Sequence, residues 1–335
     1  MKISASIYSN KEKNLEQLVR ELDAHGIDMF HIDCFDASVF DDIALIRTFS
    51  KTPIDLHIIH PKPEIFFDSI NTLKIEYVSI QHGVGAAIPA IPKNTQTHWG
   101  LALTMKDPLS AFIQPANDFD YVLFMASEPG VSGKPFDKTN FQRIIEFKQL
   151  FPKKQIQVDG GVDDRIAFIL RLLGVNSIVS GNYLMNQKFL GVGMLNLHKT
   201  PNKAVGETDF RVADFMTSEQ YLPVIEKEKL QLKGVLESIE KSALGFALVT
   251  EKQKLFGVIS NADVRRSFIN YLDSPGKADV AAMVNKKPVT IGANQTLTDM
   301  LHLLNNLNFI ILFLPVVDIE NNLKGAVLLN NLTRV

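Results

Sequence analysis

Four residues of metal-ligand type stand at comparable points of the chain. His31 and Asp33 lie in FHIDCFD, His57 lies in IDLHIIH and Asp159 lies in IQVDGGV. Each falls within or just after a short apolar run typical of a buried strand. If these strands are parallel and close into a barrel, their carboxyl ends meet at one face and the four side chains converge. Two imidazoles and two carboxylates would bind a divalent metal there, and the carboxylates would also transfer protons.

The pair His31 and Asp33 has two interpretations. Residues two apart on a strand project to the same face, so the pair would supply adjacent metal ligands. An isolated pair of this kind is more often a buried histidine that is hydrogen-bonded to a carboxylate. His57 favours the metal interpretation because it repeats the placement at the end of the next strand. Asp159 is followed by Gly160 and Gly161, a turn at which the backbone can approach a ligand closely.

The elements that would position these residues alternate between strands and helices. Residues 1 to about 185 contain eight short β-rich runs, separated mostly by helical patterns. Parallel strands with helical crossovers predict an α/β fold, and eight of them predict a (β/α)8 TIM barrel. An open doubly wound sheet is the alternative, although no G-x-G-x-x-G follows the first strand, as a dinucleotide-binding domain would have. We predict strands at Ile3–Tyr8, Met29–Cys34, Ile54–Ile58, Tyr77–Ile80, Trp99–Leu103, Tyr121–Phe124, Ile156–Val158 and Ser177–Val179, and helices at Asn14–His25, Asn140–Leu150 and Asp163–Leu173.

A different pattern follows residue 185. The segment from Met185 to Asp209 predicts a linker together with a remnant of the last helix. After it, VADFM at Val212 returns as VAAMV at Val280, and GFALVTEKQKLFGVIS at Gly245 returns as FLPVVDIENNLKGAVLL. Two copies about 65–70 residues apart predict a paired module rather than a solenoid. We therefore predict a barrel at 1–190, a linker at 191–210, and a smaller C-terminal α+β domain at 211–335 with repeats at about 211–270 and 279–335.

Length, charge and cysteine content exclude several classes of protein. A chain of 335 residues accommodates two domains. The net charge of -2 without a basic block argues against nucleic acid and membrane surfaces as partners. No apolar stretch approaches the roughly 20 residues of a membrane helix, and the N-terminus lacks an apolar signal core. The single cysteine, Cys34, fits a reducing compartment. We expect a soluble cytoplasmic protein.

Three glycine-bearing loops near the carboxylates suit a phosphate. EPGVSGKPF at residues 128–136 precedes a predicted helix, Gly160 and Gly161 lead into the helix that starts near Asp163, and Gly181 follows the eighth strand. Backbone amides from late-strand loops and a helix N-terminus commonly bind phosphate in barrels. One glycine pair would be weak evidence, because most glycines serve turns. Three such loops at late strand ends favour a phosphorylated ligand.

The motifs SASIYS, FHIDCFD, DLHIIHPKP, MASEPGVSGKPF, VDGGV and SGNYL occur in this order. Together they resemble ribulose-phosphate 3-epimerase over nearly all of residues 1–185. That family is a (β/α)8 barrel that interconverts D-ribulose 5-phosphate and D-xylulose 5-phosphate with a bound divalent metal. The resemblance implies that Asp33 and Asp159 form the acid/base pair and that the metal, which would be zinc, iron or manganese, is bound by His31, Asp33, His57 and Asp159. It also implies substrate contacts from Ser6, His57 and Asp159, and a phosphate site at Gly130, Val131, Ser132, Gly133, Gly160, Gly161, Gly181 and Asn182.

Several positions depart from the family's pattern. Phe35 stands where the family has a methionine near the substrate, and Gln81 replaces a frequent histidine after the fourth strand. The phosphate loop reads Gly-Val-Ser-Gly-Lys at 130–134, and Asn182 replaces a serine. The metal-ligand set is intact, so catalysis is expected, but another ketose phosphate is an alternative substrate. A non-catalytic sensor of sugar phosphate and nucleotide is the alternative from a different class, and a sensor would not need paired proton-transfer carboxylates.

The C-terminal repeat resembles a CBS-domain pair of the kind that is fused to sugar-phosphate isomerases. The resemblance lies in FGVISNADVRR at residues 256–266, where Ser260 and Asp263 would contact an adenine or other nucleotide. The second copy has Leu328 at the hydroxyl position and Asn331 at the acidic position, so one potential site lacks both groups. The pair would bind a nucleotide effector or would simply dimerise the enzyme. In either case we expect a homo-oligomer.

Overall fold

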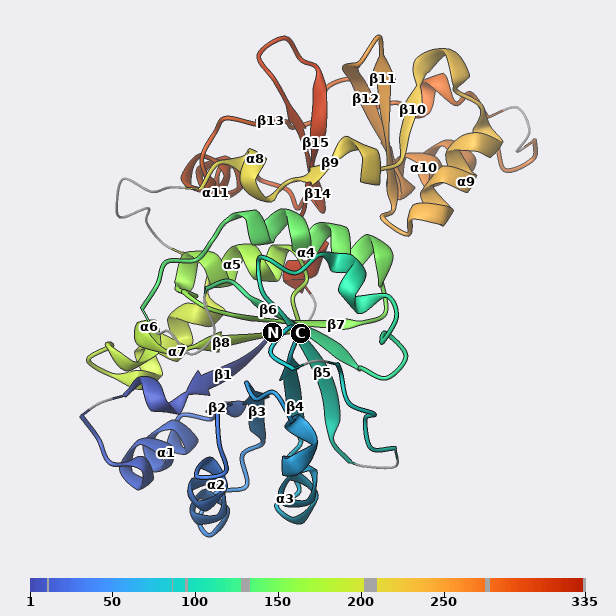
Figure 1. Cartoon of the computed structure of the whole chain (residues 1–335). Coiled ribbons are helices and arrows are strands. Elements are labelled where there is room, and N and C mark those ends of the chain that lie inside the picture. The colour runs from blue at the N-terminus through green and yellow to red at the C-terminus, as the bar shows by residue number, and fades with distance from the viewer. Residues whose placement is uncertain are drawn as a thin grey trace. The chain divides into compact units, whose positions relative to one another are not determined.

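The computed structural model of the chain describes residues 1–10, 12–85, 87–93, 96–127, 133–201, 210–274 and 278–333 (Figure 1). The described residues form two compact units, one before and one after the segment 202–209. The first unit contains the predicted barrel and the second contains the predicted repeat.

A closed barrel of eight parallel strands forms the first unit (Figure 1). Each strand pairs in parallel with the next, and β1 pairs with β8 to complete the circle. The predicted (β/α)8 fold is confirmed. Its strands are β1 Lys2–Ser6, β2 Met29–Cys34, β3 Ile54–Ile58, β4 Tyr77–Gln81, β5 His98–Leu103, β6 Tyr121–Met125, β7 Gln155–Asp159 and β8 Ser177–Ser180.

The first strand ends earlier than the sequence predicts. Its apolar and β-branched pattern extends to Tyr8, but β1 stops at Ser6 and residues Ile7–Ser9 form a 3-10 turn. The hydroxyl oxygens of Ser6 and Ser9 lie 2.9 Å apart, which ties the turn to the strand end. The turn therefore places Tyr8 at the mouth of the barrel rather than along its wall.

Helices surround the barrel and bury their apolar faces. Asn14 caps α1 by accepting a hydrogen bond from the backbone N–H of Gln17, and Leu18 and Leu22 on the same helix are buried. The three predicted helices correspond to α1, α4 and α5 within one residue at each end. The helices are α1 Leu15–Ala24, α2 Val39–Arg47, α3 Phe67–Thr72, α4 Thr139–Leu150, α5 Asp164–Leu172, α6 Asn182–Met185 and α7 Leu190–His198.

All residues of α7 except Leu190 fall within the segment that the sequence predicts as a linker from residue 191. Its residues Leu190 and Leu197 are buried, and the Arg171 guanidinium of α5 donates hydrogen bonds to the backbone carbonyls of His198 and Lys199. This packing joins α7 to the barrel, so the first compact unit extends beyond residue 191, where the predicted linker begins. The predicted remnant of the last helix is α7, and most of the remaining linker lies outside the described residues.

Two small sheets and four helices form the described part of the second unit, an α+β arrangement as predicted (Figure 1). One sheet has the order β10-β11-β12 and the other β13-β14-β15-β9. The strands are β9 Thr217–Ser218, β10 Val224–Glu226, β11 Phe246–Glu251, β12 Lys254–Ser260, β13 Ile291–Gly292, β14 Phe313–Val317 and β15 Leu323–Leu328. The helices are α8 Val212–Phe215, α9 Leu232–Ser242, α10 Asn261–Asn270 and α11 Leu297–Asn305.

The internal repeat is visible in two equivalent hairpins. The register of β11 and β12 shifts between Val249 and Thr250, and the register of β14 and β15 shifts at the corresponding point, between Val316 and Val317. The first residues of the two hairpins, Phe246 and Phe313, stack with ring centroids 3.7 Å apart. The two copies therefore pack against each other through equivalent aromatic residues.

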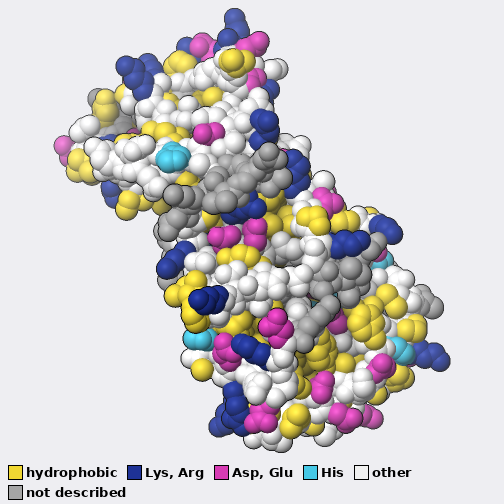
Figure 2. Space-filling model, turned by 90° about the vertical axis from the view of Figure 1, so that its left-hand side faces the viewer, with side chains coloured by type: hydrophobic (Ala, Val, Ile, Leu, Met, Phe, Trp, Pro, Cys, Tyr) yellow, Lys and Arg dark blue, Asp and Glu magenta, His cyan; other side chains and the backbone are white. Residues whose placement is uncertain are grey.

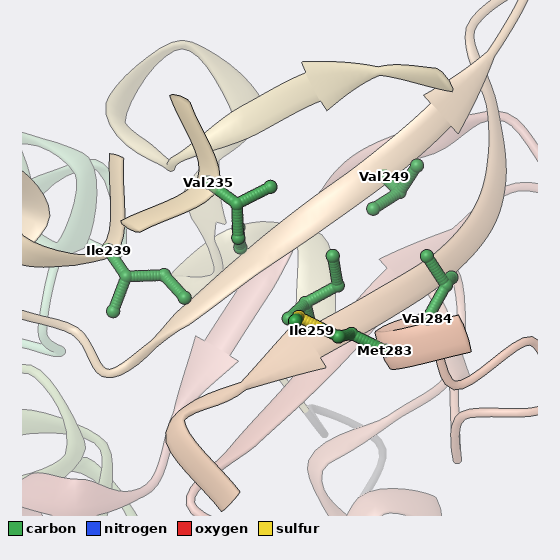
Figure 3. Close-up of a cluster of buried hydrophobic side chains, with 7 residues drawn as sticks. Val235, Ile239, Val249, Ile259, Met283 and Val284 are labelled. Carbon is green, nitrogen blue, oxygen red and sulfur yellow. The ribbon is translucent and has the colours of Figure 1, made fainter. Parts of the chain in front are cut away.

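The hydrophobic core of the first copy joins its helix and its hairpin (Figure 3). Val235 and Ile239 of α9 face Val249 of β11 and Ile259 of β12 (Figure 3). The start of the second copy adds Met283 to the same cluster. This burial holds the hairpin of the first copy in place.

Acidic and basic side chains are interspersed on the face of the molecule shown in Figure 2. This pattern agrees with the small net charge of the chain. Within the described ranges, no helix is both long and apolar enough to span a membrane.

Candidate metal centre and phosphate-binding mouth

The four side chains predicted to bind a metal come together at the carboxyl-terminal ends of the barrel strands. One ligand atom from each of His31, Asp33, His57 and Asp159 can be chosen so that all four lie within 4.8 Å of one another. The parallel register pairs Asp33 of β2 with His57 of β3, and Asp159 is the last residue of β7. Residues distant in sequence therefore meet at the face where barrel enzymes place their active sites.

A buried carboxylate orients the imidazole of His31. Its Nδ1 atom lies 2.9 Å from Oδ2 of Asp55. Its Nε2 atom lies 3.4 Å from Asp33 and 3.7 Å from Asp159, and forms no hydrogen bond with the described part of the chain. A buried nitrogen without a hydrogen-bond partner, facing two carboxylates, suits a bound cation. The donor set of the cluster fits a divalent metal.

Asp55 anchors this arrangement inside the barrel. It is wholly buried and accepts hydrogen bonds from the Ser4 hydroxyl at 2.8 Å and the Gln157 amide at 2.5 Å, in addition to its contact with His31. Metal-binding histidines commonly donate their second N–H to such a carboxylate, which fixes the ring orientation. The sequence analysis did not single out Asp55, Ser4 or Gln157.

The surroundings push the pKa values of the two site carboxyl groups in opposite directions. Burial raises the pKa of Asp159 to about 6, and the negative charge of Asp33 adds to the rise. Burial also acts to raise the pKa of Asp33, but its close contacts with the imidazoles of His31 and His57 outweigh it and hold this pKa well below its usual range. For His31, burial lowers the pKa, while Asp55 and Asp33 more than compensate and raise it well above its usual value. Carboxyl groups with separated pKa values are typical of acid/base pairs.

A cavity of about 670 Å³ opens above the cluster and is lined by both Asp33 and Asp159. This volume is within the range of small-molecule sites. Several predicted substrate residues line the same cavity, namely Ser6, Gly133, Gly160, Gly161, Gly181 and Asn182. His57 is fully buried beside it. The predicted contacts Gly130, Val131 and Ser132 lie outside the described residues.

The turn after β7 requires glycine for reasons of backbone geometry. Gly160 has φ +114°, and a Cβ atom there would lie 2.5 Å from the Ser127 hydroxyl oxygen. Gly161 has φ +65°, and a Cβ atom there would lie 2.4 Å from the backbone nitrogen of Phe136. Both values of φ disfavour residues with side chains. These glycines therefore let two loops pack closely at the edge of the cavity.

The N-terminus of α5 does not contribute free amides as the sequence analysis expected. The Asp163 carboxylate accepts hydrogen bonds from the backbone N–H groups of Arg165 at 3.0 Å and Ile166 at 2.9 Å. Asp163 also lines the cavity, so its negative charge faces the space that a phosphate would share. Asp163 thus caps this helix end itself, and a phosphate near it would have to be bound by other backbone amides.

The sequence analysis did not predict that Tyr8 and Asp42 line the cavity, although Tyr8 lies within the SASIYS motif. Tyr8 donates a hydrogen bond to Asp42 at 2.7 Å, and both residues line the cavity. Burial, followed by this hydrogen bond, raises the pKa of Tyr8. Phe35, noted as a departure from the family, is half exposed at the same mouth. Tyr8 lies two residues after Ser6, and the 3-10 turn, not the alternation of side chains along a strand, places it at the cavity.

In the second unit, Ser260 and Asp263 form a capping box at the start of α10. The Ser260 backbone N–H donates to the Asp263 carboxylate at 2.8 Å, and the Asp263 N–H donates to the Ser260 hydroxyl oxygen at 3.3 Å. Arg266 also contacts the Asp263 carboxylate. Both predicted nucleotide contacts thus have a structural role as a helix cap.

The fold and the site define a (β/α)8 barrel whose catalytic face carries a cluster of two histidines and two aspartates. Residues 2–185 match the model of the ribulose-phosphate 3 epimerase family. Because this match spans more than half of the chain, the protein belongs to that family, and its barrel is an epimerase-like isomerase. The CBS-domain model matches residues 279–335, the second copy of the repeat.

Curated relatives extend over much of the chain. Ribulose-phosphate 3-epimerase of Methanocaldococcus jannaschii is 23% identical over 236 residues, which cover 66% of this chain and 99% of the relative. The Bacillus subtilis enzyme of the same name is 24% identical over 205 residues, covering 56% of this chain and 93% of the relative. The crystal structure of CBSX2 in complex with AMP is 25% identical and covers 37% of this chain and 95% of that one, with a TM-score of 0.31.

Proposed function

We propose that the barrel catalyses metal-dependent epimerisation at C3 of a ketopentose phosphate, interconverting D-ribulose 5-phosphate and D-xylulose 5-phosphate. The observation that carries the proposal is the convergence of Asp33 and Asp159, with opposite pKa shifts, beside two histidines at the base of one cavity. Membership of the family and the names of the curated relatives support the substrate.

Asp33 and Asp159 would transfer the protons. One carboxylate accepts the proton when the C3–H bond breaks, and the electron pair of that bond forms the C2–C3 double bond of an enediolate. The other carboxyl group then donates a proton to the opposite face of C3 as the ketone re-forms. The two residues stand on β2 and β7, which are separated in the barrel by β1 and β8 and so approach the cavity from different directions.

His31, Asp33, His57 and Asp159 would hold a divalent metal. When bound, zinc, iron or manganese would act as a Lewis acid that stabilises the negative charge developing on the substrate oxygens. Asp55 keeps the His31 ring in one orientation, so that Nε2 faces the site.

Backbone groups and small polar side chains at the mouth would bind the rest of the substrate. Ser6 lines the cavity from β1, while Gly181 and Asn182 line it after β8. The phosphate would lie against these loops and the segment 130–133 rather than against α5, whose first amides are bound by Asp163. Phe35 at the cavity mouth favours a second candidate, epimerisation of another ketose phosphate.

The test is a direct assay of epimerisation with controlled metal content. Protein stripped by a chelator would be reloaded with zinc, iron or manganese and supplied with D-ribulose 5-phosphate. Product that appears only after reloading supports the proposal. Metal-loaded protein without product from this substrate, but with product from another ketose phosphate, would support the second candidate. No turnover of any ketose phosphate would favour the non-catalytic sensor.

We further propose that the C-terminal pair binds a nucleotide through Ser260 and Asp263 and that binding shifts activity or oligomeric state. Such regulation requires different nucleotide affinities for the two states. The support is the pairing of a hydroxyl and a carboxylate at the end of β12, in a unit whose second copy matches the CBS-domain model. If calorimetry with adenine nucleotides detects no binding, the dimerisation role alone remains.

A further inference from the structure

Gln81 is a buried amide in direct contact with the metal-ligand cluster. It is the last residue of β4 and is only 4% exposed. Its carbonyl oxygen Oε1 lies 3.1 Å from Nε2 of His57, which is itself fully buried. The side chain thus touches a candidate ligand from the side that faces away from the cluster.

The amide of Gln81 is held in one orientation. Its Nε2 group donates to the backbone carbonyl of Ala102 at 3.1 Å and to the backbone carbonyl of His82 at 3.3 Å. Turning the amide over would place its oxygen against two carbonyl oxygens, which cannot donate. The group that faces His57 is therefore an acceptor.

A hydrogen-bond acceptor next to one ring nitrogen of an imidazole determines which nitrogen carries the hydrogen. Because Oε1 can only accept, Nε2 of His57 must carry the N–H. In the neutral ring Nδ1 then presents a lone pair, and this atom lies 3.2 Å from the Asp33 carboxylate. A lone pair and a carboxylate at this separation repel each other unless a proton or a metal ion lies between them, and the donor set of the cluster suits a metal ion. His31 shows the reverse arrangement, since its Nδ1 faces Asp55 and its Nε2 faces the cluster.

We propose that Gln81 is a positioning residue that fixes the tautomer of His57, so that this histidine binds the metal through Nδ1 while His31 binds it through Nε2. The inference rests on the metal binding proposed above. A neutral amide at this position sets the ring without adding a charge, in contrast to Asp55 beside His31. Partners of this kind typically contribute a factor of about 10–100 to metal affinity.

The tautomer is measurable on the unmodified protein. Nitrogen-15 NMR of the zinc-loaded full chain, with the His57 ring assigned, shows which ring nitrogen carries hydrogen. We expect a proton on Nε2 and none on Nδ1. A proton on Nδ1 in the zinc-loaded protein would overturn the proposal, whatever the variants do.

Variants measure the contribution of the amide. Gln81→Met removes the acceptor at similar volume and is expected to weaken zinc binding about 10–100-fold in competition with a chromophoric chelator. Gln81→Glu in its protonated form can donate to Ala102 and accept from His57, and should retain most of the affinity. Ser79→Ala is the matched control, because Ser79 is buried on the same strand and its hydroxyl has no hydrogen-bond partner in the described structure.

The outcomes separate this proposal from the proposed function. If the wild type binds none of zinc, iron and manganese, the metal-dependent function fails. If the wild type binds zinc and Gln81→Met binds it equally tightly, only the role of Gln81 is refuted. Equal weakening by Ser79→Ala and Gln81→Met would also refute it, since a general loss of packing would then explain both.

Discussion

Replacing Asp159 by asparagine should stabilise the metal-free protein while it removes a metal ligand. Asp159 has a pKa of about 6 in the folded state, against an ordinary value of 3.8. The folded protein therefore retains a proton between these pH values that the unfolded chain has already lost. The contribution of Asp159 to the free energy of unfolding must fall as pH rises through this window, because ionising Asp159 inside the cluster costs free energy.

The magnitude follows from the pKa difference. A rise from 3.8 to about 6 corresponds to roughly 3 kcal/mol at about 1.36 kcal/mol per pKa unit. The asparagine side chain carries no charge to bury, so the difference in unfolding free energy between Asp159→Asn and the wild type should grow by roughly 3 kcal/mol between about pH 4 and pH 8. Comparing the two proteins at each pH cancels the titration of groups that the substitution leaves unchanged.

Urea unfolding in a chelator, followed by tryptophan fluorescence, is the assay. Trp99 is the only tryptophan of the chain and is buried on β5, so the signal reports on the barrel. Asp33→Asn is the matched comparison with the opposite sign. The pKa of Asp33 is held low by His31 and His57, so its ionised form is stabilising above about pH 4 and the substitution should destabilise the barrel at about pH 8. The reasoning is refuted if both variants shift stability in the same direction at that pH.

Three further predictions concern other parts of the molecule. Asp55→Asn should weaken zinc binding by about 10–100-fold in chelator competition, because His31 loses its anionic partner; unchanged affinity would show that Asp55 does not orient the ring. Gly160→Ala should lower the free energy of barrel unfolding by more than Gly26→Ala, since both glycines have positive φ but only the Cβ at 160 would collide with Ser127; equal losses would contradict the packing argument. Ser260→Ala and Thr296→Ala each remove a capping-box hydroxyl and should each lower the unfolding free energy of the second unit by about 1 kcal/mol in urea. Only Ser260→Ala should weaken nucleotide binding in calorimetry. Equal nucleotide affinity in the two variants would show that Ser260 acts only as a helix cap.

The barrel was predictable because its strands are short runs rich in apolar or β-branched residues, and because α1 and α5 begin after the capping residues Asn14 and Asp163. Met29–Cys34 and Ile54–Ile58 match β2 and β3 at both ends. The end of β1 was predicted too late because the strand-like sequence pattern continues beyond Ser6. The chain turns there instead, and a hydrogen bond between the hydroxyl groups of Ser6 and Ser9 joins the turn to the strand end. The early linker boundary arose because α7 has no pronounced polar face, so its packing on α5 left little trace in the pattern.

The four metal-type residues were predictable because strand alternation and register are enough to bring them together. The same alternation would have identified Asp55, two residues before His57, and Gln157, two residues before Asp159, as inward-facing polar residues. The orientation of Gln81 was not predictable, since it depends on the backbone carbonyl of Ala102 on the neighbouring strand. Asp163 caps α5 by binding backbone amides that a phosphate could also use. The sequence alone does not show which of the two groups binds them.

The central claim is two-carboxylate proton transfer at C3 of a ketopentose phosphate. The most direct measurement is NMR of D-ribulose 5-phosphate in heavy water with the metal-loaded wild type, Asp33→Asn and Asp159→Asn. We predict deuterium incorporation at C3 together with D-xylulose 5-phosphate for the wild type, and loss of product in both variants. Product formation that persists in either metal-loaded variant would contradict the assignment of Asp33 and Asp159 as the acid/base pair.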